Sequence, residues 1–339
     1  MQKLKNDLTK SDRKLQENTI YKYIKDFEKI TKYFLKDKQF KSYSFLKDSD
    51  KVFFYLDSLS YSQKFNLIKV ICIVLNINRG KARKGYQRVL KLYQNYLTNL
   101  VKEYNKEKAT GKKTNKEIAN WLDWITITNH VDELYEQFYN KYFNEDGKCK
   151  VDLINCGVQN LKEVHLLMTL ALYIYLPPRR LEYAFCKYIR LNEFEKLSED
   201  DMDNNIYLVH IDINNNFISF GKNKIKNKTN KNIKINFTEK LNIINSIFIN
   251  LNYFQRSQKY GNSFLFNSQL NQMSTTSLSQ YLQKHFKKHF NKEVSVSMLR
   301  KSYRTHKLAP IKKLIKEAEK DSEKMNHSLQ SGFTHYCKV

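Results

Sequence analysis

The chain has few glycines and prolines and no long apolar run. Its 339 residues include only 8 Gly and 3 Pro, and apolar residues recur at helical spacing, which together predict a mainly α-helical protein. No segment approaches the ~18–20 uncharged apolar residues of a membrane span. Residues 1–5 lack the apolar stretch of a signal peptide. We therefore expect a protein without a membrane partner, located inside the cell wherever its target is found.

Metal- and cofactor-binding patterns are also missing. The 5 cysteines form an odd set without C-x-x-C spacing, so neither a disulfide framework nor a zinc site is indicated and free thiols are expected. No carboxylate cluster that could hold Mg²⁺ and no glycine-rich phosphate loop is evident. The sequence predicts no metal and no cofactor.

Positive charge, in contrast, is abundant. The chain has 60 Lys and Arg against 34 Asp and Glu, a formal net charge of +26. The basic residues are spread through segments that also carry aromatic and aliphatic residues at helical spacing. This distribution indicates a folded protein that faces a polyanion.

The pattern along the chain predicts two domains. We expect a helical core- and DNA-binding domain at 12–107, a basic linker at 108–115 and a catalytic domain at 116–339. The period changes from helical to alternating in three short segments, which predict an antiparallel three-stranded sheet at 206–211, 217–220 and 233–237. Helices are expected at 20–34, 52–56, 65–75, 86–106, 121–124, 131–143, 161–175, 239–251, 277–290, 297–307 and 312–320.

Arg179 follows two prolines, Pro177 and Pro178. Proline ends a helix and is tolerated in the first turn of the next one, so Arg179 is expected at a helix start, where free amides favour an anion. A guanidinium can bond two phosphate oxygens and stays charged at any working pH. Arg180 is the alternative to Arg179 in this role, and a surface arginine beside a proline kink is the structural alternative.

Arg300 is the second candidate for phosphate binding. It lies in the expected helix 297–307, three residues after Ser297, whose hydroxyl can donate one hydrogen bond to a phosphate oxygen. The motif by itself has little specificity, because many helices contain Leu-Arg-Lys.

A histidine and a tyrosine stand close to the end of the printed sequence. Tyr336 follows His327 by nine positions. A phenol that loses its proton, with a pKa of ~10 in water, can attack phosphorus when cations stabilise the phenolate. Histidine can donate to a phosphate or accept the phenol proton, although a single histidine at a helix end often has a structural role.

The order Arg179, Arg300, His327 and Tyr336, with Glu182 three residues after the first arginine, resembles the tyrosine recombinase (integrase) family. The Pro-Pro form of the first motif is similar to versions from large DNA viruses, virophages and related mobile elements. The resemblance covers residues 160–339 by motif and implies the catalytic fold of that family, an α+β domain following a helical domain.

Family membership implies a site-specific DNA recombinase or integrase for DNA breaking and rejoining. Tyr336 would form a 3′-phosphotyrosyl link and release a 5′ hydroxyl, without metal or ATP, and a homotetramer (a pair of dimers) would act on paired sites. A viral enzyme would be found in the host nucleus, in a cytoplasmic viral factory or in the virion. Ser297 departs from the family pattern, which has a histidine there, and only three residues follow Tyr336 in the printed sequence.

The resemblance also implies a lysine general acid on the turn between the second and third predicted strands. The segment 221–231 is rich in lysine. Placing the third strand at 233–237 favours Lys224, and Lys222 and Lys226 stay open. Most lysines of this segment would be solvated or in contact with backbone phosphates.

Two other functions fit the same residues. A type IB topoisomerase shares the arginine, lysine, histidine and tyrosine set but relaxes DNA as a monomer. A non-catalytic basic DNA-binding protein derived from the family would also account for Ser297.

Overall fold

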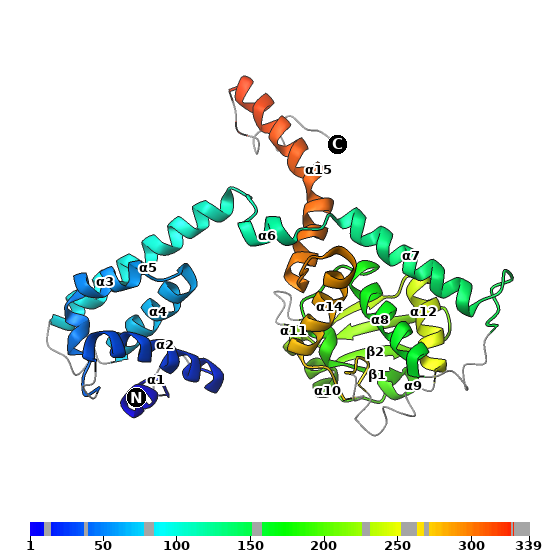
Figure 1. Ribbon diagram of the computed structural model, residues 1–339, viewed down its shortest axis with the longest axis horizontal. Helices are drawn as coiled ribbons and strands as arrows, with labels where there is room; N and C mark the ends of the chain where they lie inside the picture. Colours follow the sequence, from blue (N-terminus) through cyan, green and yellow to red (C-terminus); the bar gives the residue numbers. More distant parts are fainter. Residues whose placement is uncertain are drawn as a thin grey trace. The chain divides into compact units, whose positions relative to one another are not determined.

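The computed structural model describes residues 1–9, 15–36, 40–77, 85–150, 158–225, 231–251, 263–267, 271–326 and 328, with the side chains at 85, 108, 109, 158, 224 and 225 excepted. The protein is mainly helical with one small sheet (Figure 1). None of the described helices is long and apolar enough to cross a membrane.

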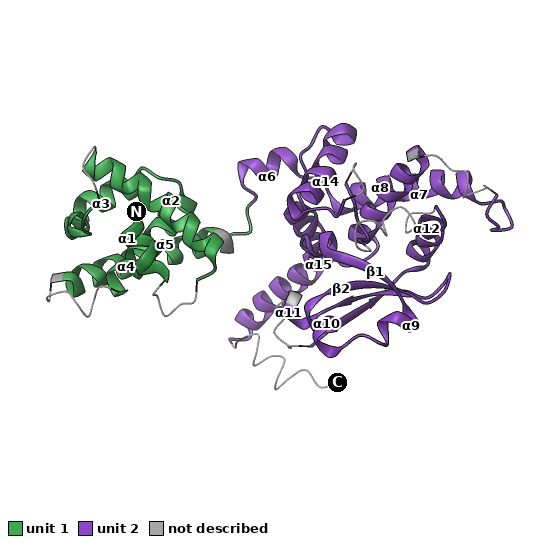
Figure 2. Cartoon of the chain, turned by 90° about the horizontal axis from the view of Figure 1, so that it is seen from below, with its two compact units in different colours: residues 1–112 green, residues 113–339 purple. Residues whose placement is uncertain are grey.

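The chain divides into two compact units, Met1–Lys112 and Lys113–Val339 (Figure 2). The division falls inside the predicted linker 108–115. The helix before it runs through Ala109, and the next helix begins at Asn115, so the extended stretch is shorter than the predicted linker.

Unit 1 is all-helical in its described part. Its elements are α1 (Gln2–Thr9), α2 (Glu17–Leu35), η1 (Ser44–Lys47), α3 (Ser49–Asp57), α4 (Tyr61–Ile77) and α5 (Gly85–Ala109).

Helix α4 forms the centre of unit 1. Its residues from Leu67 to Leu75 are buried on nearly every face, which is expected of a helix surrounded by others. Helix α1 packs on α2 and α4 and contributes the fully buried Leu4 and Leu8. The unit therefore includes residues that precede the predicted domain start at 12.

Unit 2 begins with helices and ends with helices, and its strands lie between them. Its elements are α6 (Asn115–Asn120), α7 (Trp124–Tyr142), α8 (Val158–Ile174), η3 (Glu182–Phe185), β1 (Cys186–Arg190), α9 (Leu191–Phe194), α10 (Glu199–Asn204), β2 (Ile206–His210), β3 (Asn216–Phe220), α11 (Lys222–Ile225), β4 (Ile233–Asn236), α12 (Glu239–Asn250), α14 (Thr275–Phe290) and α15 (Val296–Lys324).

The sheet has four strands in the order β1-β2-β3-β4. Strands β2, β3 and β4 form the predicted antiparallel meander, with Leu208 opposite Ile218 and Ile218 opposite Ile235. The prediction of a three-stranded antiparallel sheet is wrong in one respect, because β1 adds a fourth strand parallel to β2. Parallel neighbours need a crossover connection, which here runs through α9 and α10. Strand β1 is only five residues long and includes the polar Lys187, so its own sequence does not predict a strand paired with β2.

Both faces of the sheet are covered. Side chains such as Ile218 and Phe220 join the main core of unit 2 with α8 and α12, whereas Val209 and Phe217 pack on the other face against residues of the α9 segment. Strands β2 and β3 are accordingly buried along almost their whole length, as expected of strands enclosed on two sides.

Two helix predictions need correction. Residues 121–123 are not helical, because Trp121 is extended and bonds to Asp123, and Trp124 is already the first residue of α7. The predicted helices 297–307 and 312–320 are one helix, α15, which continues through Pro310.

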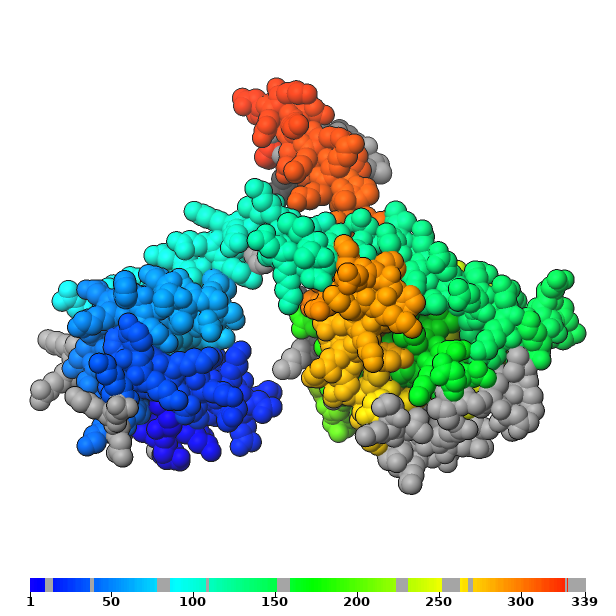
Figure 3. All heavy atoms as spheres, in the orientation of Figure 1, coloured from blue at the N-terminus to red at the C-terminus, as the bar shows by residue number. Residues whose placement is uncertain are grey.

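The second half of α15 extends away from the rest of unit 2 (Figure 3). Pro310 removes one helical hydrogen bond, and its position on an exposed stretch lets water satisfy the freed carbonyl. Leu308, Ile311, Leu314 and Ile315 are all exposed there.

Candidate active site

Arg179 lies in the irregular segment between α8 and η3. It does not begin a helix as predicted, because the next element, η3, is a single 3-10 turn that starts three residues later. Pro177 and Pro178 keep the segment extended. The Tyr173 hydroxyl fixes the segment by donating a hydrogen bond to the Arg180 carbonyl at 2.7 Å. The position of Arg179 is therefore set by a loop and its packing and not by the amides of a helix end.

The Arg179 side chain is largely enclosed, with 22% of its surface exposed. Its guanidinium carbon lies 4.5 Å from the centre of the Phe220 ring at the end of β3. The Glu182 carboxylate is 4.0 Å from Nη2, the limit of an ion pair. Stacking on an aromatic ring holds the guanidinium plane while leaving its edge free to bond.

Arg300 is in the second turn of α15. The helix begins after Ser295, whose hydroxyl accepts the Met298 amide at 3.3 Å. Leu299 is fully buried, and the buried Ser302 donates to the Leu122 carbonyl at 2.8 Å. These contacts anchor the first turns of α15 to the body of unit 2, so the backbone that carries Arg300 is well fixed.

Two buried tyrosines, Tyr173 and Tyr183, are each within electrostatic reach of one of the two arginines. The Tyr173 and Tyr183 rings meet edge to face with centroids 5.1 Å apart. Burial raises the pKa of Tyr173 well above its ordinary value, and the charge of Arg300 opposes that rise. Burial likewise raises the pKa of Tyr183, and Arg179 opposes it. Each arginine is thus close enough to act on one member of the same tyrosine pair.

Three buried polar atoms of this cluster lack a hydrogen bond within the described part of the chain. They are Arg179 Nε, Glu182 Oε2 and the Tyr183 hydroxyl. Buried polar atoms are normally paired, and an unpaired one calls for an explanation. The Nε–H is closed off from solvent in this conformation, so a phosphate contact of Arg179 would use the terminal guanidinium nitrogens. Neither tyrosine is a candidate nucleophile here, because both are buried.

Ser297 and Arg180 have different surroundings. Ser297 is exposed in the first turn of α15, and a residue three positions before Arg300 shares its helix face. The Arg180 side chain is exposed, and the residue's backbone carbonyl accepts the hydrogen bond from Tyr173. The enclosed position of Arg179 therefore makes it the better candidate of the two for a preorganised phosphate contact.

The lysine-rich segment starts directly at the end of β3. Gly221 packs so closely on the last turn of α10 that a Cβ there would overlap the backbone oxygens of Met202 and Asp203. The next residue, Lys222, forms an ion pair with Asp203 at 2.6 Å. The Lys222 side chain is therefore held by Asp203 where the lysine-rich segment begins.

The other lysine candidates are only partly described. Lys224 is in the short helix α11 between β3 and β4, which corrects the expectation of a simple turn there. Its side chain and all of Lys226 lie outside the described residues. The location between these two strands follows the predicted order, and the choice of general acid stays a prediction.

His327 and Tyr336 also lie outside the described residues. Of the five predicted catalytic residues, the structure describes the side chains of Arg179 and Arg300 and brings both to the Tyr173–Tyr183 pair.

Sequence reasoning missed three histidines of unit 2, His130, His285 and His289, which the structure brings together. The four-residue spacing of the last two places them on one helix face and was a readable signal. The contribution of His130 had no local signal, because it is far away in the sequence.

No known protein family, no curated protein and no solved structure matches this chain.

Proposed function

We propose that the protein is a site-specific DNA recombinase or integrase of the tyrosine type, which cuts and rejoins DNA through a 3′-phosphotyrosyl intermediate. The observation that supports the proposal is the setting of the two arginines, each of which acts electrostatically on one ring of a packed tyrosine pair. Arg179 and Arg300 come from sequence motifs far apart, yet each acts on one member of the Tyr173–Tyr183 pair. Two such cations can neutralise the charge on the non-bridging oxygens of one phosphate.

In the proposed reaction, Tyr336 attacks the scissile phosphorus and the 5′ oxygen leaves as a hydroxyl. Arg179 and Arg300 bind the non-bridging oxygens, and His327 exchanges a proton with the phenol or the phosphate. A lysine, Lys224 in the first place, protonates the leaving oxygen. The ion pair of Lys222 with Asp203 favours Lys224 over Lys222, because a donor held by a carboxylate is less free to reach DNA.

Double-stranded DNA is the proposed partner, bound by a homotetramer on paired sites. The net charge of +26 supports this partner, and binding that depends on phosphate contacts falls steeply as salt rises. The proposed setting is a mobile element or a large DNA virus.

The central test is a covalent trap. The full chain is incubated with fragmented DNA, the adducts are isolated and sequenced, and nicked suicide substrates are then made from the recovered sites. We expect the wild type to form a protein–DNA adduct on these substrates. Tyr336→Phe should bind DNA with unchanged affinity and form none. Tyr21→Phe, which alters an exposed tyrosine of unit 1, is the matched control and should react like the wild type.

The other outcomes are equally informative. An adduct that survives in Tyr336→Phe would show that the nucleophile is wrong. Binding without any adduct in the wild type would favour a non-catalytic DNA-binding protein. Relaxation of supercoiled DNA by a monomer, without exchange between paired sites, would favour a type IB topoisomerase.

A second experiment addresses the general acid. Lys224→Ala should lose cleavage of ordinary DNA and regain it on a substrate with a 5′-bridging phosphorothiolate, because a thiolate leaves without being protonated. Failure of this rescue would move the role to Lys226 or Lys222.

A further inference from the structure

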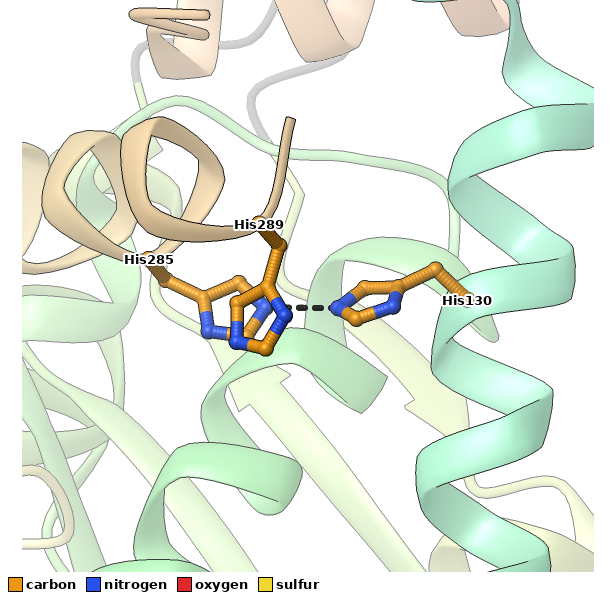
Figure 4. A group of neighbouring side chains, drawn as sticks. All are labelled: His130, His285 and His289. Carbon is orange, nitrogen blue, oxygen red and sulfur yellow. Dashed lines mark hydrogen bonds between the residues drawn. The ribbon is translucent and has the colours of Figure 1, made fainter. Parts of the chain in front are cut away.

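Three histidine rings from two helices of unit 2 face one another. His130 projects from α7, and His285 and His289 project from α14 (Figure 4). One ring nitrogen of each lies within 4.8 Å of the other two. In the part of the chain that the structure describes, no other group of three metal-binding side chains comes this close.

The helices hold these rings in place. His285 and His289 are one turn apart and so share a face of α14. His130 Nε2 lies 2.9 Å from His285 Nε2, and the His130 ring meets Phe290 edge to face at 5.0 Å. His285 is buried, with 7% of its surface exposed, whereas His289 is exposed. The cluster thus has a closed inner side and a side open to solvent.

Two ring nitrogens at 2.9 Å are a specific arrangement. They can form a hydrogen bond only if one carries a proton and the other does not, which leaves the third ring without a role in the pair. A metal ion, in contrast, uses all three nitrogens in the same way. Zinc accepts histidine nitrogens at about 2.0–2.1 Å in a tetrahedron, which sets ligand nitrogens about 3.3 Å apart.

The distances require little change to reach that geometry. The His130–His285 contact is shorter than the zinc value by a few tenths of an ångström, and the widest separation in the cluster is 4.8 Å at most. Rotation of the exposed His289 about its side-chain bonds shortens that separation without disturbing the core.

The electrostatic surroundings suit a cation in one respect and oppose it in another. His285 and His289 are in the last two turns of α14, whose carbonyl end carries partial negative charge. Lys287 and Lys288 share this end and oppose a cation, whereas the charge of Glu133 acts favourably on His130.

We propose that His130, His285 and His289 bind one divalent transition-metal ion, Zn²⁺ in the first place, that links α7 to α14. Solvent completes the coordination on the side of the exposed His289. The site is independent of the proposed recombinase chemistry, because it shares no residue with the arginine cluster. It would stiffen unit 2 upstream of α15, the helix that carries Arg300.

The test uses the full chain after treatment with a chelator, with ZnCl₂ as the probe. Titration calorimetry should show one high-affinity site per chain, and zinc should raise the melting temperature of unit 2, because a ligand that binds only the folded state stabilises it. X-ray absorption at the zinc edge should show nitrogen ligands and no sulfur.

Variants then assign the ligands. His289→Ala and His130→Ala should each weaken binding by more than the roughly 10–100-fold that loss of an outer-shell partner costs. His289 is exposed, so its replacement leaves the core intact and keeps the test valid if His130→Ala is unstable. His306→Ala removes an exposed histidine of α15 outside the cluster and should bind zinc as the wild type does.

Three results would overturn the proposal. They are an absence of zinc binding, zinc affinity unchanged in both cluster variants, and sulfur in the coordination shell, which would assign the ion to the cysteines. None of them bears on the covalent DNA adduct, so the two proposals can fail separately.

Discussion

Replacement of Arg179 by methionine should separate a catalytic from a structural role for this side chain. Methionine keeps a flexible apolar chain against the Phe220 ring and removes the charge. The change deletes a cation–π contact of 4.5 Å, worth about 0.5–2 kcal/mol. It also deletes an ion pair to Glu182 that is long, at 4.0 Å, and worth about 0–1 kcal/mol.

A gain offsets these losses. The buried Arg179 Nε has no hydrogen-bond partner among the described residues, and leaving such a donor unpaired costs about 1–3 kcal/mol, which methionine recovers. Glu182 keeps 20% of its side-chain surface in contact with solvent, although its Oε2 is buried without a hydrogen bond, so the carboxylate stays partly solvated after the change. We expect the free energy of unfolding of unit 2 to change by less than about 2 kcal/mol.

The effect on DNA cleavage should be far larger. Loss of one preorganised donor to a developing oxyanion costs about 10²–10³ in rate, so adduct formation on a suicide substrate should fall by at least that factor. Stability can be measured on the full chain, because both tryptophans, Trp121 and Trp124, belong to unit 2. Their fluorescence in a denaturant titration reports this unit alone.

Two control variants make the result decisive. Arg190→Met removes an exposed arginine at the end of β1 that bonds to Tyr188, so it should cost about 1 kcal/mol of stability and leave adduct formation nearly unchanged. Arg180→Met tests the alternative assignment. A loss of 3 kcal/mol or more in Arg179→Met, as expected when a well-formed buried ion pair is broken, would refute the reasoning. So would an adduct rate within a few-fold of the wild type, or a larger defect in Arg180→Met.

Three further variants test the fold. Gly221→Ala should lower the free energy of unfolding of unit 2 by about 3 kcal/mol, because the new methyl overlaps backbone oxygens of α10. Tryptophan fluorescence in a denaturant titration measures this loss, and an unchanged free energy would show that the backbone there can move apart freely. Lys301 chiefly, with the backbone at the start of α6, lowers the pKa of Glu117 from 4.5 to about 2. The ionised Glu117 therefore stabilises the fold fully above about pH 4.5, and this stabilisation is lost as the pH falls towards 2. The difference in free energy of unfolding between wild type and Glu117→Gln should shrink over that interval. A constant difference would contradict the ion pair. Leu8→Ala should destabilise unit 1 by about 2–5 kcal/mol, because this leucine is fully buried. The loss should appear as reduced hydrogen-exchange protection in α2 and α4. Unchanged protection would show that α1 is not part of the core.

Helices and antiparallel strands were predictable where the pattern is local. The predicted helices 239–251 and 277–290 agree with α12 and α14 to within two residues at either end. Apolar residues at helical spacing form one stripe that packs on the core, and this pattern is visible in the local sequence. Strands β2, β3 and β4 were likewise readable, because strands that follow one another in the sequence usually lie side by side in a sheet.

Failures of prediction occurred where a distant partner decides. Strand β1 is held by β2 across the α9–α10 crossover, and its own five residues do not indicate that pairing. The predicted helices 297–307 and 312–320 are one helix, α15, which continues through Pro310. The prolines before Arg179 predicted a helix start, whereas the packing of Tyr173 on the Arg180 carbonyl fixes a loop.

The sequence by itself determined the charge of the protein, most of its helices and the identity of the candidate arginines, because each of these depends on residue type and short-range periodicity. Only the tertiary structure decided which distant side chains meet. It brought Arg179 and Arg300 to one pair of tyrosines and His130 to the histidines of α14. Such meetings depend on how helices and strands pack around a shared core, and that information is spread over many residues and absent from any single motif.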